Sequence, residues 1–142
     1  MILLDTNVLS ELMKPRPDKK VVSWLDEQSE WDLWTSAITV AEIFLGIALL
    51  DDGKKKSLLF ALAQQMFDED FKDRCLPFDD QAAAEYAMIV SERVKNGRPI
   101  SVEDAQIAAI SKTANLTLAT RNVKDFDHID GLELINPWVA GG

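Results

Sequence analysis

The chain has 142 residues, which is the length of one ordinary domain and too short for two. Hydrophobic residues make up 47% and charged residues 27%, proportions that fit a folded globular protein and exclude disordered and collagen-like chains. Acidic residues number 24 against 15 Lys and Arg, so the net charge is -9. A protein with this charge needs a divalent cation or a local basic patch to hold an anionic substrate such as nucleic acid.

Short apolar runs alternate with helical segments along the whole sequence. The apolar runs predict five strands, which span residues 2–4, 33–38, 75–78, 116–120 and 132–135. Apolar residues at helical spacing predict helices between them, over residues 8–13, 18–25, 39–50, 54–67, 79–97 and 101–115. Strands this far apart in the chain need crossover connections. We therefore predict a single three-layer α/β/α domain over residues 1–142, with a mainly parallel five-stranded sheet.

No segment of the sequence has the pattern of a secretion signal or a membrane span. The first residues lack a basic leader and a cleavage site, and the apolar stretch 37–50 is interrupted by Glu42 and shorter than the ~20 residues of a membrane span. The single cysteine, Cys75, excludes an internal disulfide and fits a reducing compartment. We expect a cytoplasmic protein that does not contact membranes.

The residues available for catalysis favour carboxylate chemistry. His128 is the only histidine, so imidazoles cannot serve as both general acid and general base. The glycine-rich phosphate loops of NTPases and dinucleotide enzymes are absent, and so is the nucleophile elbow of serine hydrolases. Acids near the ends of predicted strands and the starts of predicted helices are therefore the candidate functional groups.

Two of these acids, Asp5 and Asp104, have both a functional and a structural interpretation. Asp5 follows the first predicted strand, and ligands of parallel α/β sheets bind outside the carboxyl ends of the strands. However, Asp5 can also cap the next helix, and Asp104 follows a capping serine, Ser101. Capping explains each acid separately, but it does not require acids at several places that the topology brings together.

A third acid, Glu42, lies in the predicted helix 39–50, which is apolar on every side and is expected to be buried. A carboxylate in such a helix is unfavourable unless it is hydrogen-bonded, paired or bound to metal. The alternative is a capping box, in which Thr39 begins the helix and Glu42 binds back to the amide of Thr39. The sequence leaves both interpretations open.

Four segments, in order, resemble the PIN-domain ribonucleases, and among them the VapC-type and FitB-like toxins of bacterial toxin–antitoxin pairs. These segments are Leu4-Asp5-Thr6-Asn7, Thr39-Val40-Ala41-Glu42 with Gly46 beyond it, residues 100–109 around Asp104, and Ala119 to Phe126. The closing Asn136-Pro137-Trp138 is similar to the FitB-like branch. The resemblance covers essentially the whole chain.

The resemblance implies a catalytic cluster of Asp5, Glu42, Asp104 and Asp125, in which Asp5 and Asp104 bind Mg²⁺ or Mn²⁺. Asn122 is the alternative to Asp125 for the fourth position, since relatives differ in which of these positions carries the acid. Oxygen ligands without histidine or thiolate favour these ions over zinc. A bound ion would lower the pKa of a water molecule and offset the charge of a phosphodiester.

These implications predict a metal-dependent endoribonuclease toxin that cleaves RNA, forms a homodimer and is neutralised by a cognate antitoxin with a DNA-binding domain. DNA would be contacted only through the antitoxin. The alternative is a catalytically weak binding module that acts within a DNA-bound regulatory complex, an interpretation that the uncharged Asn122 keeps open. A third interpretation, a phosphotransferase of the haloacid-dehalogenase type, needs an aspartate two residues after Asp5, where Asn7 stands.

An RNA substrate would have to contact local basic patches. The sequence offers three, which are Lys14 with Arg16, Lys19 and Lys20, then Lys54 to Lys56, and then Arg93 with Lys95 and Arg98. Each patch has the alternative interpretation of a solvated helix face.

Overall fold

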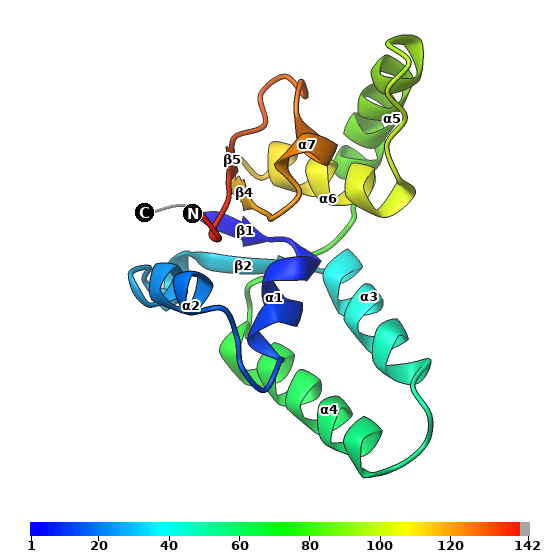
Figure 1. The fold of residues 1–142 in the computed structure, drawn as a ribbon. Helices are drawn as coiled ribbons and strands as arrows, with labels where there is room; N and C mark the ends of the chain where they lie inside the picture. Colours follow the sequence, from blue (N-terminus) through cyan, green and yellow to red (C-terminus); the bar gives the residue numbers. More distant parts are fainter. Residues whose placement is uncertain (140–142) are drawn as a thin grey trace.

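Five parallel strands form a sheet in the order β3-β2-β1-β4-β5 in the computed structural model, which describes residues 1–139 (Figure 1). The strands are β1 (Ile2–Leu4), β2 (Leu33–Ser36), β3 (Cys75–Leu76), β4 (Thr117–Ala119) and β5 (Leu134–Ile135). The sheet confirms the predicted fold class. β3 ends earlier than predicted because Pro77 has no N–H with which to continue the ladder.

Helices cover both faces of the sheet (Figure 1). On one face lie α5 (Asp80–Lys95), α6 (Val102–Thr113) and the short α7 (Val123–Phe126). On the other face lie α1 (Thr6–Leu12), α2 (Lys19–Asp26), α3 (Ala37–Ala48) and α4 (Lys54–Gln65). A 3-10 turn at Glu30–Asp32 precedes β2, and a π-helical turn at Met66–Asp70 extends α4. Within residues 1–139, no helix combines the length and the apolar character that a membrane crossing requires.

The central strand β1 divides its side chains between two hydrophobic cores. Leu3 packs in the core that includes α5, α6 and α7, whereas Leu4 packs in the core that includes α1, α2, α3 and α4. This division follows from the two-residue period of a strand, and burial on both faces explains why the strand is uniformly apolar. Leu118 and Ala119 of the neighbouring β4 are divided in the same way. Both strands are therefore held rigidly up to their carboxyl ends.

The start of α3 differs from the sequence prediction. Ser36, the last residue of β2, is the N-cap, and its hydroxyl accepts a hydrogen bond from the backbone N–H of Thr39 at 3.2 Å. Thr39 therefore lies in the first turn, and the predicted capping box of Thr39 and Glu42 is wrong. The helix begins where the extended backbone of β2 ends, so Glu42 is left without a capping role.

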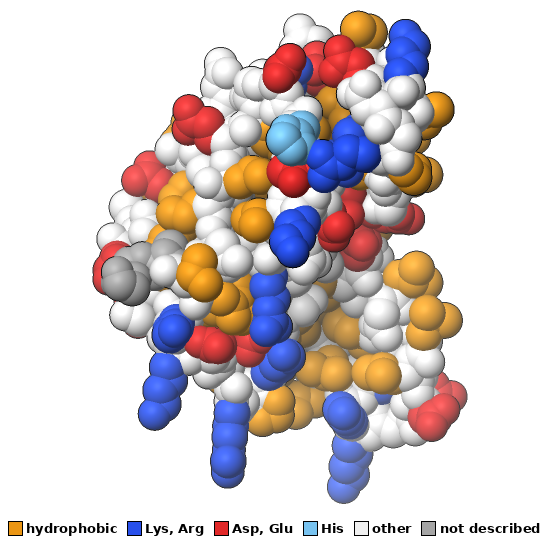
Figure 2. All heavy atoms as spheres, turned by 45° about the horizontal axis from the view of Figure 1, so that its top comes forward, with side chains coloured by type: hydrophobic (Ala, Val, Ile, Leu, Met, Phe, Trp, Pro, Cys, Tyr) orange, Lys and Arg blue, Asp and Glu red, His pale blue; other side chains and the backbone are white. Residues whose placement is uncertain are grey.

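The prediction that α3 is buried on every side is also wrong. Ile43 and Ile47 pack in the core, but Leu45 and Leu49 are 59% and 76% exposed. The reason is that α3 lies at the edge of its helical layer, where only one side of the helix meets the rest of the chain (Figure 1). Figure 2 shows hydrophobic side chains on the surface at the lower right, in the region of α3 and α4.

Candidate metal centre

The strand order reverses between β1 and β4, which are neighbours at the centre of the sheet. The chain leaves β1 toward one helical layer and β4 toward the other, and such a divergence opens a crevice where parallel α/β sheets bind ligands. A cavity of about 390 Å³ lies at this point. Its lining includes Asp5, Glu42 and Asp104, three of the four predicted site residues.

Asp5 lies in this cavity at the junction of β1 and α1, where it is only 4% exposed. The hydroxyl of Thr120 donates to Oδ2 of Asp5 at 2.7 Å, and the backbone N–H of Thr6 donates to Oδ1 at 2.8 Å. Burial raises the pKa of Asp5 to about 6, although these two hydrogen bonds lower it. The nearby charges of Asp104 and Glu42 raise it further. A buried carboxyl with such a pKa, at the base of a crevice, is typical of a functional site.

Glu42 reaches the cavity from the second turn of α3. The hydroxyl of Thr6 donates to Oε1 of Glu42 at 2.7 Å and lies 3.0 Å from the hydroxyl of Thr39. Thr6 thus binds two acids, Asp5 through its backbone N–H and Glu42 through its side chain. The first residue of α1 therefore fixes the relative positions of both carboxylates.

Asp104 enters the cavity from the first turn of α6, in the opposite helical layer. Its backbone N–H donates to the hydroxyl of Ser101 at 3.2 Å, which confirms the predicted cap. Burial raises the pKa of Asp104, a hydrogen bond with the Ser101 side chain lowers it, and the charges of Asp125 and Glu42 raise it. The backbone of Asp104 therefore takes part in the cap while the residue also lines the cavity. Its functional role stays a prediction.

Asp125 and Asn122 are the two candidates for the fourth predicted site position, and only Asn122 lines the cavity. Asn122 lines the cavity, and its backbone N–H donates to the hydroxyl of Thr120 at 3.1 Å. Asp125 lies on α7, where it is exposed and outside the cavity lining. Its charge nevertheless raises the pKa of Asp104. A catalytic role for Asp125 stays a prediction.

The donor set of the cavity fits Mg²⁺ or Mn²⁺. Its lining offers carboxylate, hydroxyl and amide oxygens, and neither histidine nor cysteine is among the lining residues. In the described part of the chain, no three carboxylate, histidine or cysteine side chains are arranged to hold an ion by themselves. Mg²⁺ does not need three, since it keeps several waters and is usually bound by one or two carboxylates. A cation between Asp5 and Asp104 would also remove their mutual repulsion.

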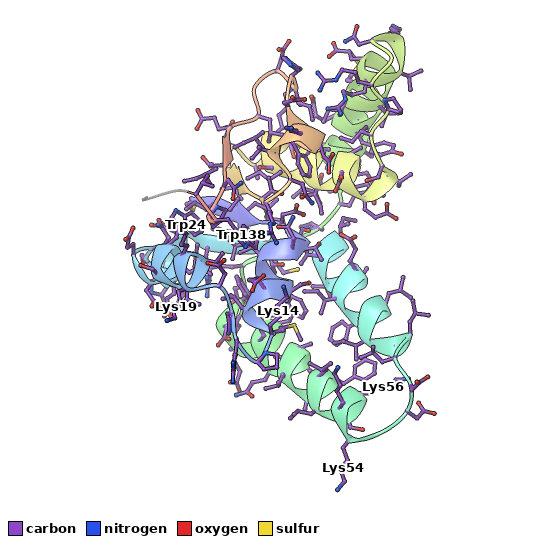
Figure 3. The ribbon with its side chains drawn as sticks, in the orientation of Figure 1. Lys14, Lys19, Trp24, Lys54, Lys56 and Trp138 are labelled. Atoms are coloured by element: carbon purple, nitrogen blue, oxygen red, sulfur yellow. The ribbon has the colours of Figure 1, made fainter. Side chains whose placement is uncertain are left out.

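Two basic residues line the cavity within the described chain, and only one of them belongs to a predicted basic patch. They are Lys14, which follows α1, and Arg121, which follows β4. The guanidinium of Arg121 lies 5.1 Å from the ring centroid of Trp138, which is placed near the beginning of α1 (Figure 3). Arg121 follows the carboxyl end of the central strand β4, and this position in the sequence is the signal that could have predicted a basic residue at the cavity. Arg93 of the predicted patches is instead buried, and it donates to two backbone carbonyls.

The PIN domain family matches residues 2–132. The chain belongs to this family. It is 47% identical over 138 residues to Toxin FitB of Neisseria gonorrhoeae, with 97% of this chain and 99% of that protein covered. It is 38% identical over 138 residues to VapC ribonuclease Y4jK of Sinorhizobium fredii, with 97% and 98% covered.

Solved structures agree with this membership. FitAcB from Neisseria gonorrhoeae matches this PIN domain with a TM-score of 0.91 and 47% identity, over 98% of this chain and 99% of that one. FitAB bound to an IR36 DNA fragment matches with a TM-score of 0.90 and 46% identity, over 97% and 96%. The resemblance seen in the sequence is therefore confirmed.

An apolar groove of about 900 Å³ shares part of its lining with the acidic cavity of this PIN domain. The groove lies between α1, α3 and α4, and the residues that line both hollows are Ser10, Lys14 and Glu42. Leu58 and Leu62 of α4 line the groove although they are 60% and 45% exposed (Figure 2 shows this region at the lower right). Exposed leucines that line a mainly apolar groove are a candidate surface for a binding partner.

The raised pKa of Asp5 predicts a pH-dependent stability for the metal-free protein. A folded-state pKa of about 6, against an ordinary value of 3.8, favours the folded protein while Asp5 is protonated. That contribution is complete below pH 3.8 and is lost as the pH rises through about 6, a change of about 3 kcal/mol. In EDTA, Asp5→Asn should therefore stabilise the protein at pH 7.5 but not at pH 4, as measured by urea unfolding. Asp80→Asn, at an exposed position, is the control, and an equal effect at both pH values would contradict the expectation.

The hydrogen bond from Thr120 predicts the direction of a pKa change at Asp5. Thr120→Val keeps the branched shape of the side chain but removes the hydroxyl that stabilises the carboxylate, so the pKa of Asp5 should rise above about 6. The measurement is an NMR titration of the Asp5 carboxyl carbon. Thr117→Val, in β4 three residues before Thr120 but without a bond to Asp5, should leave the titration unchanged. Equal curves for the wild type and Thr120→Val would rule out this contact.

Proposed function

We propose that this PIN domain is a metal-dependent endoribonuclease that hydrolyses RNA phosphodiester bonds and acts as the toxin of a toxin–antitoxin pair. The observation that carries the proposal is the cavity at the strand-order reversal, which Asp5, Glu42 and Asp104 line together. The relatives named Toxin FitB and VapC ribonuclease support it, because they match along nearly their whole length.

The chain's own residues hold and orient the acidic groups. Asp5 and Asp104 would bind the ion, and a bound Mg²⁺ or Mn²⁺ supplies stabilisation of negative charge on the phosphate and lowers the pKa of water. Thr120 and Thr6 each donate to a different oxygen of Asp5, so its carboxylate cannot rotate away. Glu42, held through Oε1 by Thr6, would accept a hydrogen bond from the attacking water and orient it.

The apolar groove supports an antitoxin partner. Solved relatives include FitAB and the Rickettsia felis VapBC2, both described with bound DNA fragments. We infer that the cognate antitoxin packs an apolar segment against Leu58 and Leu62 and reaches the acidic cavity where the groove meets it. The antitoxin would then make the contacts to DNA. The homodimer that the family resemblance implies stays a prediction.

A catalytically weak binding module within a DNA-bound complex is the second candidate function. The DNA-bound relatives and the uncharged Asn122 at the cavity favour it. The two candidates differ in one measurable property, which is cleavage of RNA by the isolated protein.

Antitoxin-free protein should cleave a structured RNA pool in Mg²⁺ or Mn²⁺ and should not cleave it in EDTA. Asp5→Asn and Asp104→Asn each remove a ligand charge. Each should lower the cleavage rate by more than the roughly 10–100-fold that the loss of an outer hydrogen-bond partner produces. The readout is the initial rate on a labelled RNA, and Mn²⁺ binding measured by calorimetry should weaken in parallel.

Asp80→Asn is the matched control for this series, because Asp80 is an exposed acid at the start of α5 and lies outside the cavity lining. It should cleave RNA and bind Mn²⁺ like the wild type. Folded wild-type protein that cleaves nothing under any condition would refute the ribonuclease and favour the binding module.

Leu58→Glu and Leu62→Glu should each weaken binding of the cognate antitoxin by about tenfold or more, because they place a charge in the apolar groove. RNA cleavage by the free protein should persist, since neither leucine lines the acidic cavity. Val94→Glu is the control, at a position on α5 that is 63% exposed and outside the groove. Unchanged affinity in both leucine variants would place the antitoxin elsewhere.

A further inference from the structure

The two basic residues of the cavity differ in their partners. Nζ of Lys14 lies 2.9 Å from Oε1 of Glu11, and Oε2 of Glu11 accepts the backbone N–H of Asp18. Lys14 is therefore already paired with a carboxylate, although its own side chain is largely exposed. Arg121 forms no ion pair within residues 1–139, and its side chain is exposed at the cavity. Arg121 thus keeps its charge available to a bound molecule.

The backbone of Arg121 is also bonded to two other segments of the chain. Its backbone N–H donates to Oδ1 of Asn7 at 3.4 Å, and its carbonyl accepts from Nδ2 of Asn136 at 3.3 Å. Oδ1 of Asn136 in turn accepts the backbone N–H of Trp138 at 2.9 Å. Three separate segments, which follow β1, β4 and β5, are tied together at this residue.

The ring of Trp138 orients the guanidinium. Trp138 is only 9% exposed, and its ring centroid lies 5.1 Å from Cζ of Arg121, which is cation–π distance. A guanidinium that lies over a nearly buried ring has that side covered and keeps N–H groups free for hydrogen bonding. A fork of N–H donors with reduced freedom is well suited to bidentate binding of a phosphate.

The charge of the cavity makes such a group necessary for a nucleic-acid substrate. Asp5, Glu42 and Asp104 repel a polyanion, and the chain as a whole carries a net charge of -9. An ion bound by the acids would offset charge only at the phosphate being cleaved. A neighbouring phosphate of the same strand enters the same negative field and needs a cation of its own.

We propose that Arg121 is a substrate-positioning residue, which binds a phosphate adjacent to the scissile one while Trp138 holds its guanidinium in place. This role rests on the proposed ribonuclease function. It places the RNA strand across the cavity mouth between the acids and the segment that follows β5. Lys14, occupied by Glu11, contributes less to binding.

RNA binding under varied salt tests the role of Arg121. Asp5→Asn is the parent, so that bound RNA is not cleaved, and a fluorescent single-stranded RNA is the probe in Mg²⁺. Adding Arg121→Ala should weaken binding by about tenfold. The slope of log affinity against log salt should become shallower by about 0.7, which corresponds to one phosphate contact on a single strand. Arg121→Lys should keep the slope but bind less tightly than the parent, because lysine lacks the planar fork.

Lys124→Ala is the matched control, since it removes one exposed positive charge three residues away and outside the cavity. It should change neither the affinity nor the salt slope. With Asp5 intact, Arg121→Ala should raise KM far more than it lowers kcat, while its Mn²⁺ affinity and thermal midpoint stay at wild-type values. A merely structural arginine would instead lower the thermal midpoint without changing the salt slope.

The outcomes separate this inference from the proposed function. If the wild type cleaves RNA and Arg121→Ala binds it as tightly as its parent, only the role of Arg121 is refuted. If the wild type neither cleaves nor binds RNA, the ribonuclease proposal fails and the positioning role fails with it.

Discussion

The site brings Asp5, Glu42 and Asp104 together in one cavity. The rest of the structure has to withstand the repulsion between their carboxylates. Burial is the main cause that raises the pKa of Asp5 to about 6, and the charges of the other two acids add to it. Such a cluster persists only where the surrounding structure is rigid enough to oppose it. Here the three acids extend from β1, α3 and α6, and each of these elements is anchored by core side chains. A divalent cation would convert the same repulsion into attraction.

The polar groups around the acids explain how the fold tolerates them. Thr120 is fully buried, and its oxygen donates to Asp5 while it accepts from the side chain of Asn7 and the backbone of Asn122. Thr6, the first residue of α1, bonds to both Asp5 and Glu42. Hydrogen bonds of this kind offset part of the desolvation of a carboxylate, but they do not neutralise its charge. Their arrangement therefore orients the acids without removing their affinity for a cation.

The sequence was sufficient for the features that depend on local pattern. Alternating apolar runs and helices predicted the parallel sheet, and the strand end at Asp5 predicted one wall of the site. Features that depend on distant residues were not predictable in this way. Ser36 and Thr39 are both good capping residues, and only the extent of β2 decides between them. Asp125 follows the family pattern but lies outside the cavity lining, whereas Arg121 lines it and contacts Asn7, which is 114 positions away in the sequence.

The shared lining of the cavity and the groove links the proposed activity to its proposed inhibition. A partner segment that is bound along the groove lies against Ser10, Lys14 and Glu42, and these residues also form one wall of the acidic cavity. Such a segment would occupy space that an RNA strand needs, so inhibition would not require any change in the fold. The acids favour a basic group at that point for the same electrostatic reason that they favour a metal ion. Thus the charge cluster that would serve the proposed catalysis would also provide the attraction through which a partner could block it.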